Sequence, residues 1–122
     1  MEEFDIESRL VEEIRAGNKF IEARLGKPEF LKIKEGDVVS IRENLWLRNQ
    51  VIDSFSDAIR IKITQILYFE TFHEMLHAID HRGAIPTAKT IEDALEVYKN
   101  LYSQADENEF GVIAFYFDLI LT

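Results

Sequence analysis

The segment Gly111–Leu121 is apolar at almost every position, and Asp118 is its single charged residue. The segment is shorter than the roughly 18 apolar residues that a membrane-spanning helix needs. It also lacks the alternating polar positions of a strand that is exposed on one face. A strand buried on both faces fits this pattern best. The chain must therefore place this strand inside a sheet and cover both faces of that sheet.

The spacing of apolar residues elsewhere predicts further strands and helices. The predicted strands are Lys19–Leu25, Val38–Arg42 and Ile59–Ile66. The predicted helices are residues 7–16, Thr71–Ile79 and Ile91–Tyr102. The polar, mixed stretch Glu43–Asp57 is expected to form a long loop. This irregular order favours an α+β fold with a small, partly closed β-barrel over a regular βαβ array.

The composition predicts one globular domain over residues 1–122, because 47% of the residues are hydrophobic and can supply a core. The chain has no cysteine, which excludes disulfides, thiolate metal sites and cysteine catalysis. The acidic start, Met1–Asp5, does not resemble a secretory signal. We therefore expect a cytoplasmic protein with no membrane partner.

The charge of the chain limits its possible partners. A formal net charge of −9 argues against broad, non-specific binding to nucleic acid, which depends on Lys and Arg contacts to phosphates. Residues 19–42 are an exception, with six basic residues against four acidic ones. A local site for a small anionic or polar ligand is compatible with this distribution.

The segment His73–His77 matches the zinc-protease pattern H-E-x-x-H, in which two histidines on one helix face bind Zn²⁺. The apolar stripe of this helix runs from Phe72 to Ile79 and places His73, Glu74 and His77 on the solvent side. His81 lies further along and supplies no suitable third ligand. We therefore predict a solvated helix face, neither a zinc peptidase nor a built metal site. Weak, adventitious metal binding by the histidines is left open.

The stretch Gly17–Arg24 reads G-x-K-x-x-E-x-R and is more informative. Glu22 and Arg24 stand two residues apart, so they share the strand face opposite the apolar row. An Arg beside a Glu offers both donors and acceptors, which is what recognition of a nucleobase edge requires. The alternative is an exposed, salt-bridged strand face that contributes under about 1 kcal/mol.

Together with four further segments in the same order, this stretch resembles the ASCH family, small domains of the PUA-like superfamily. The other matching segments are Ile33–Val39, Tyr68–Leu76, Thr90–Ser103 and Gly111–Ala114. The resemblance spans essentially the whole chain, with a longer loop at Glu43–Asp57. It implies a single ASCH-like domain, namely a small PUA-like β-barrel with flanking helices and a cleft beside the G-x-K-x-x-E-x-R strand.

The resemblance also implies a function, because the superfamily binds RNA or modified bases. The expected partner is RNA or a small nucleoside or nucleotide, with no cofactor. The predicted ligand-binding residues are Lys19, Glu22, Arg24, Arg42 and Trp46, with Lys19 on a phosphate or carbonyl and Trp46 stacked on a base.

An enzymatic alternative stays open. One branch of the family hydrolyses the acetyl amide of N4-acetylcytidine with a catalytic Lys and Thr. This chain keeps Lys19 but has Glu22 in place of the Thr, which favours binding over catalysis. A small hydrolase, either an amidohydrolase on an acylated nucleoside or a ribonuclease, would use Lys19 and Glu22 as its reacting pair.

Overall fold

The computed structural model describes residues 1–121, which form one mixed sheet and six helices. The strands are β1 (Glu3–Glu7), β2 (Ile21–Leu25), β3 (Val38–Leu47), β4 (Gln50–Phe69) and β5 (Val112–Ile120). The helices are α1 (Ser8–Arg15), α2 (Pro28–Leu31), α3 (Phe72–Ala78), α4 (His81–Ala84), α5 (Ile91–Leu101) and α6 (Gln104–Phe110). None of the helices over these residues is long and apolar enough to cross a membrane.

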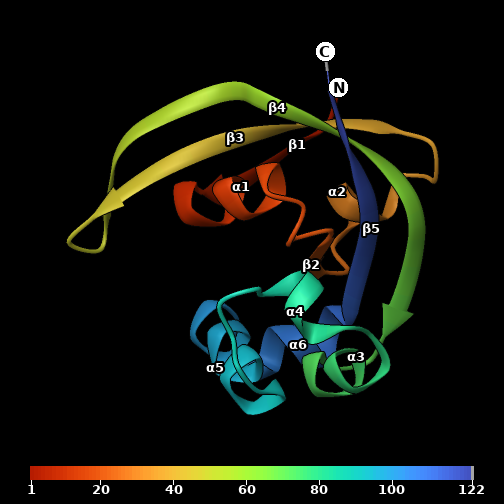
Figure 1. The fold of residues 1–122 in the computed structure, drawn as a ribbon. Coiled ribbons are helices and arrows are strands. Elements are labelled where there is room, and N and C mark those ends of the chain that lie inside the picture. Colours follow the sequence, from red (N-terminus) through yellow and green to blue (C-terminus); the bar gives the residue numbers. More distant parts are fainter. Residues whose placement is uncertain (122) are drawn as a thin grey trace.

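The sheet curls into a half-barrel in the strand order β1-β3-β4-β5-β2 (Figure 1). Strand β4 is 20 residues long and pairs antiparallel with β3 along its first part and with β5 along its second. Breaks in the register at Ile41/Glu43, Leu45/Trp46 and Ile63/Gln65 bend the long strands. Strand β1 closes the far edge by pairing parallel with β3. The predicted α+β class is therefore confirmed, with a curled sheet.

The hydrophobic core has two parts, one on each side of β5. Val112 and Ala114 pack with β2, α3, α4 and α5, whereas Ile113, Phe115 and Phe117 pack with β1, β3, β4 and α1. Figure 1 shows α1 inside the curve of the sheet, while α3, α5 and α6 gather at one end. The prediction that this strand is buried on both faces is confirmed for its first half.

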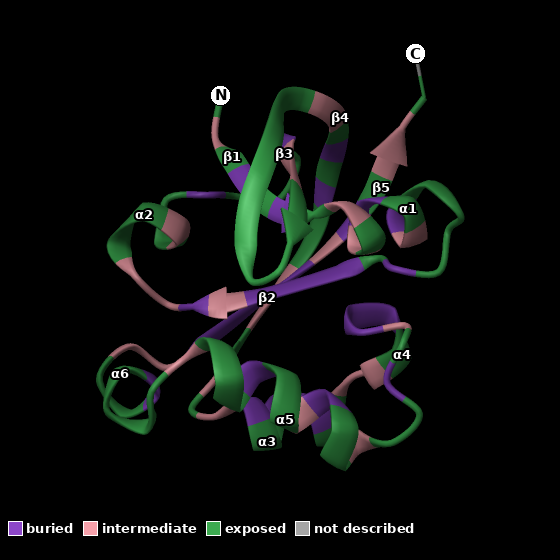
Figure 2. Ribbon diagram, turned by 90° about the vertical axis from the view of Figure 1, so that its left-hand side faces the viewer, coloured by how far each residue is buried: buried purple, intermediate pink, exposed green. Residues whose placement is uncertain are grey.

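The prediction of a loop over Glu43–Asp57 is wrong. These residues form the arm of a long hairpin, in which β3 runs to Leu47 and β4 begins at Gln50. Arg48 and Asn49 make the two-residue turn with φ of 52° and 64°, the left-handed conformations that such turns require. Over residues 45–57 the arm stands clear of the core and is exposed on both faces (Figure 2), so burial imposes no alternation on its sequence.

Replacing Gly26 by alanine is expected to lower the free energy of unfolding by about 1–3 kcal/mol, the usual range for overpacking. A Cβ at this position would lie 2.7 Å from the carbonyl oxygen of Phe110, which is backbone and cannot turn aside. Chemical denaturation measures the loss. Gly83→Ala is the matched control, because the three atoms nearest its Cβ all belong to the Phe20 ring, which is 36% exposed and can rotate away. Equal losses in the two variants would contradict the prediction.

Candidate functional site

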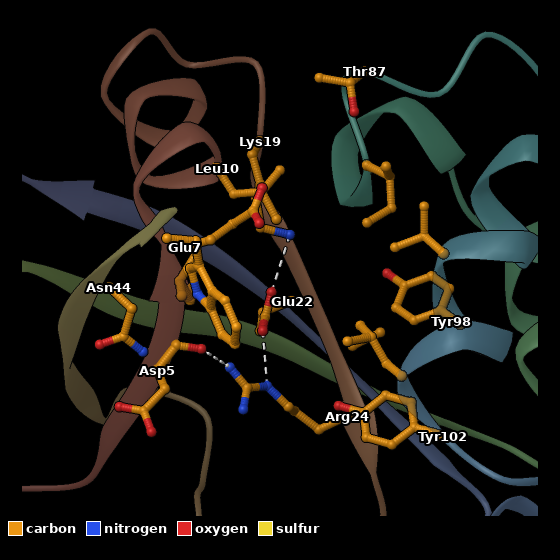
Figure 3. Close-up of a pocket in the computed structure, with 16 residues that line it drawn as sticks. Asp5, Glu7, Leu10, Lys19, Glu22, Arg24, Asn44, Thr87, Tyr98 and Tyr102 are labelled. Atoms are coloured by element: carbon orange, nitrogen blue, oxygen red, sulfur yellow. Dashed lines mark hydrogen bonds and ion pairs between the residues drawn. The ribbon is translucent and has the colours of Figure 1, made fainter. Parts of the chain in front are cut away.

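A cavity of about 470 Å³ lies between β1, α1, β2, the outer part of β3 and the segment from α4 to α5 (Figure 3). This volume falls within the roughly 300–1,000 Å³ typical of small-molecule sites. Four of the predicted ligand-binding residues line it, namely Lys19, Glu22, Arg24 and Trp46. The hairpin, the N-terminal strand and α5 are distant in sequence, so the cavity exists only in the folded chain.

Lys19 is only 2% exposed at the edge of the cavity, just before β2. Its ammonium donates to the carbonyl oxygens of Ile21 and Ala84, both at 2.6 Å, and lies 3.0 Å from Glu22 Oε1. An ammonium has three N–H donors, and each of them has an acceptor here. The Lys19 side chain therefore ties β2 to the C-terminal end of α4.

Glu22 joins Lys19 to Arg24 across the floor of the cavity (Figure 3). Arg24 Nε donates to Glu22 Oε2 at 2.7 Å, and Arg24 Nη2 donates to the carbonyl oxygen of Asp5 at 2.7 Å. The Arg24 guanidinium also lies over the rings of Phe4 and Phe30, at 5.1 and 5.7 Å from their centroids. Lys19, Glu22 and Arg24 thus form one ion-pair triad.

Burial and charge act in opposite directions on the triad. Burial would raise the pKa of the Glu22 carboxyl, but the charges of Lys19 and Arg24 outweigh it and hold this pKa below its ordinary value of 4.5. Burial lowers the pKa of Lys19 from 10.5, although the attraction of Glu22 opposes this change. Glu22 is therefore an ionised carboxylate at neutral pH.

Two tyrosines face the triad across the cavity, Tyr98 from α5 and Tyr102 from the position that follows this helix. Tyr98 and Tyr102 stand one turn apart, and the ring of Phe72 stacks on both, with centroids 4.5 and 5.3 Å away. Figure 3 shows both hydroxyl groups directed toward the cavity. Burial and the negative charge of Glu22 raise the pKa of Tyr98 well above 10, and burial raises that of Tyr102. Neither hydroxyl forms a hydrogen bond within residues 1–121, so both are available to a ligand as neutral donors or acceptors.

The sequence predicts Tyr98 and Tyr102 as part of the helix Ile91–Tyr102, among its apolar residues, and gives them no place in a binding site. The signal that could have found them is the presence of two hydroxyl-bearing rings at i and i+4 on that stripe, because buried tyrosines normally need a polar partner.

Trp46 and Arg42 differ in where the structure places them. Trp46 is 51% exposed on the hairpin arm and lines the cavity together with Asn44. Arg42 does not line it, because its guanidinium is held on the sheet by Glu3 at 3.0 Å and by the Ser54 hydroxyl at 3.2 Å. The structure thus separates Arg42 from the other predicted ligand-binding residues.

The H-E-x-x-H segment lies on the outer face of α3, and the prediction of a solvated face is confirmed. His73 and His77 are exposed, their ring centroids are 4.4 Å apart, and His77 Nδ1 lies 2.9 Å from the carbonyl oxygen of His73. The helix ends at Ala78, so His81 belongs to α4. No group of three or more potential ligands in residues 1–121 could hold a metal ion.

Comparison with known proteins gives structural relatives only. No family model matches the chain, and no curated protein matches it. The crystal structure of the hypothetical protein PH0355 is similar, with a TM-score of 0.82, 27% identity and 97% coverage of both chains. The solution structure of protein PF0455 from Pyrococcus furiosus has a TM-score of 0.75 and 25% identity, and covers 99% of this chain and 98% of that one. These matches support the fold over nearly its full length, and the resemblance to the ASCH family stays a prediction.

Proposed function

We propose that the protein binds a nucleobase-containing ligand, either RNA or a modified nucleoside or nucleotide, in the cavity above the ion-pair triad. The observation that carries the proposal is the position of the triad: three ionised side chains form the floor of a cavity whose walls are largely aromatic and apolar. Removing ions from water costs free energy, and two strands with only a structural role can pair without that cost. Such an arrangement suits specific recognition in an apolar site.

The groups that face the cavity suit a planar ring with polar edges. Tyr98 and Tyr102 offer hydroxyls that can donate or accept. Arg24 uses Nε and Nη2 within the protein and keeps Nη1 for a ligand acceptor. The half-exposed indole of Trp46 offers a surface on which a base can stack. A nucleobase needs both in-plane hydrogen bonds and a stacking partner.

The contacts of Lys19 and Glu22 favour binding over hydrolysis. A lysine nucleophile must lose its proton and reach the substrate, whereas the Lys19 amine is engaged by three oxygens. A general base works best with a pKa near neutrality, whereas that of Glu22 is held below 4.5. In this proposal the two residues position the floor, and Lys19 does not contact a phosphate.

The test is a thermal-shift screen against nucleosides, nucleotides and short RNAs, followed by calorimetry on each hit. Trp46→Ala is expected to weaken binding by about 5- to 150-fold, the range of stacking on one base. Tyr98→Phe is expected to weaken it about fivefold through one lost hydrogen bond. Both variants should fold, because Trp46 is half exposed and phenylalanine keeps the Tyr98 ring.

The control is Tyr68→Phe, which removes a hydroxyl from an exposed ring that does not line the cavity. It should bind like the wild type. A screen without any hit, or a Trp46→Ala variant with wild-type affinity, would refute the proposal. Release of acetate from N4-acetylcytidine that disappears in Lys19→Ala would instead support the hydrolase.

A further inference from the structure

The cavity is lined by more carboxylates than free cations. Its charged residues are Asp5, Glu7, Glu22, Lys19 and Arg24. Both cations are paired with the single carboxylate of Glu22, at 3.0 and 2.7 Å. The other two acidic residues of the lining, Asp5 and Glu7, lie on β1, and Figure 3 shows the Asp5 carboxylate turned away from the triad.

We infer that the ligand enters this cavity without a negative charge, so that the site selects a nucleoside or free nucleobase over its 5′-phosphate or an RNA strand. The inference rests on the proposed function and narrows its ligand class. It also assigns a role to Asp5 and Glu7, two residues outside the G-x-K-x-x-E-x-R segment.

The first support is that neither lining cation has an unshared charge for a phosphate, because Lys19 and Arg24 are both paired with Glu22. Proteins bind phosphate with Lys and Arg side chains that keep several N–H donors available, often in pairs. The three donors of Lys19 are all used by protein oxygens. Arg24 makes two hydrogen bonds within the protein and packs its guanidinium against Phe4 and Phe30. A phosphate would have to break the triad to obtain a full ion pair.

The second support is the charge at the opening. The Asp5 side chain is 65% exposed, and Glu7 is exposed beside it at the end of β1. The Asp5 carboxylate lies 3.8 Å from Arg42 Nε, which is only 3.0 Å from Glu3, and it also attracts the charge of Arg24. Arg42 is therefore shared between two acids, and it does not line the cavity. A phosphate or a strand backbone leaving the cavity on this side would meet like charge.

The third support is that the unpartnered polar groups opposite the triad are neutral. The hydroxyls of Tyr98 and Tyr102 can each donate to a carbonyl or accept from an N–H of an uncharged ring. Neutral donors of this kind leave a phosphate charge uncompensated, whereas they satisfy the edge of a heterocycle. The cavity thus offers polar groups without an unpaired positive charge.

The experiment compares each nucleoside that binds with its 5′-monophosphate and with a trinucleotide that carries the same base in the middle. Calorimetry at low salt should show the monophosphate binding about tenfold more weakly than the nucleoside, which equals roughly 1.4 kcal/mol. The double variant Asp5→Asn/Glu7→Gln should bring this ratio toward one. Glu29→Gln/Asp118→Asn is the matched control, because it removes the same charge from exposed positions outside the cavity and should leave the ratio as in the wild type.

The outcomes separate the two claims. A monophosphate or trinucleotide that binds as tightly as the nucleoside, and loses affinity in Trp46→Ala, would overturn the inference while the proposed function stands. The inference also fails if the control double variant changes the ratio as much as Asp5→Asn/Glu7→Gln does. Absence of binding by every compound would overturn the proposed function, and the inference with it.

Discussion

The Glu22→Gln variant is expected to lose about 3–5 kcal/mol of unfolding free energy, the usual cost of breaking a buried ion pair from one side. The substitution keeps the shape of the side chain but leaves the ammonium of Lys19 without its paired carboxylate and removes the main counter-charge of the Arg24 guanidinium. Lys19 is fully buried, so water cannot replace the lost partner. Denaturant unfolding at pH 7, followed by circular dichroism, measures the loss.

Two further variants make this prediction specific. Glu96→Gln changes an exposed acid on α5 and should alter stability by less than about 0.5 kcal/mol. Lys19→Met/Glu22→Gln removes the unpaired ammonium as well, so part of the loss should be recovered and the two sites should be non-additive. A loss below about 1 kcal/mol in Glu22→Gln would mean that the triad is not buried in solution.

Acid titration provides an independent check of the same triad. The pKa of Glu22 is lower in the folded state than its ordinary value of 4.5. The unfolded chain therefore binds the proton more tightly, and the contribution of Glu22 is fully present above pH 4.5 and is lost as the pH falls through the folded-state pKa. Wild-type stability should fall over this range more steeply than that of Glu22→Gln.

The Phe72→Ala variant is expected to lose about 3–5 kcal/mol, as large-to-small changes of buried aromatic residues do. Phe72 is 1% exposed and lies between α3 and α5, stacked on Tyr98 and Tyr102. Its removal leaves a void behind both tyrosines of the cavity wall. Thermal or chemical denaturation reports the loss, and ligand affinity should fall in whatever fraction stays folded.

Phe55→Ala is the matched control for this second prediction. Phe55 is an exposed phenylalanine on the hairpin arm, so its truncation should change stability by less than about 0.5 kcal/mol. Phe72→Leu should lie between the two, because leucine fills part of the space. A Phe72→Ala variant as stable as Phe55→Ala would show that α3 does not pack against α5 as described.

The elements predicted correctly are those whose faces are fixed by burial. Strands β5 and β2 were recognisable from their apolar residues. In β2, Ile21, Ala23 and Leu25 all point into one core. The hairpin arm was not recognisable as strands, because Leu45, Trp46 and Leu47 are all exposed and no core packs against either face of the arm there. Strand β1 depends on a parallel pairing with a distant segment, which local pattern does not encode.

The candidate site was recovered in part for a similar reason. Lys19, Glu22 and Arg24 are local in sequence, so one motif could identify them together. Tyr98 and Tyr102 join them only through the packing of α5, and the hydrogen bond from Lys19 to Ala84 depends on where α4 settles. Arg42 belongs to the basic stretch 19–42 and to the predicted ligand-binding residues, but its partners on β1 and β4 hold it away from the cavity.

The cross-link made by Lys19 bears on how such a protein can diversify. Its ammonium holds β2 and α4 together, so a substitution at the floor of the cavity lowers the stability of the fold before it can alter ligand preference. The polar ends of the wall residues have no such structural role within residues 1–121, because Trp46 is half exposed and the hydroxyls of Tyr98 and Tyr102 form no hydrogen bond there. We therefore expect new ligand preferences to arise by substitution at the wall, over a floor that stays the same.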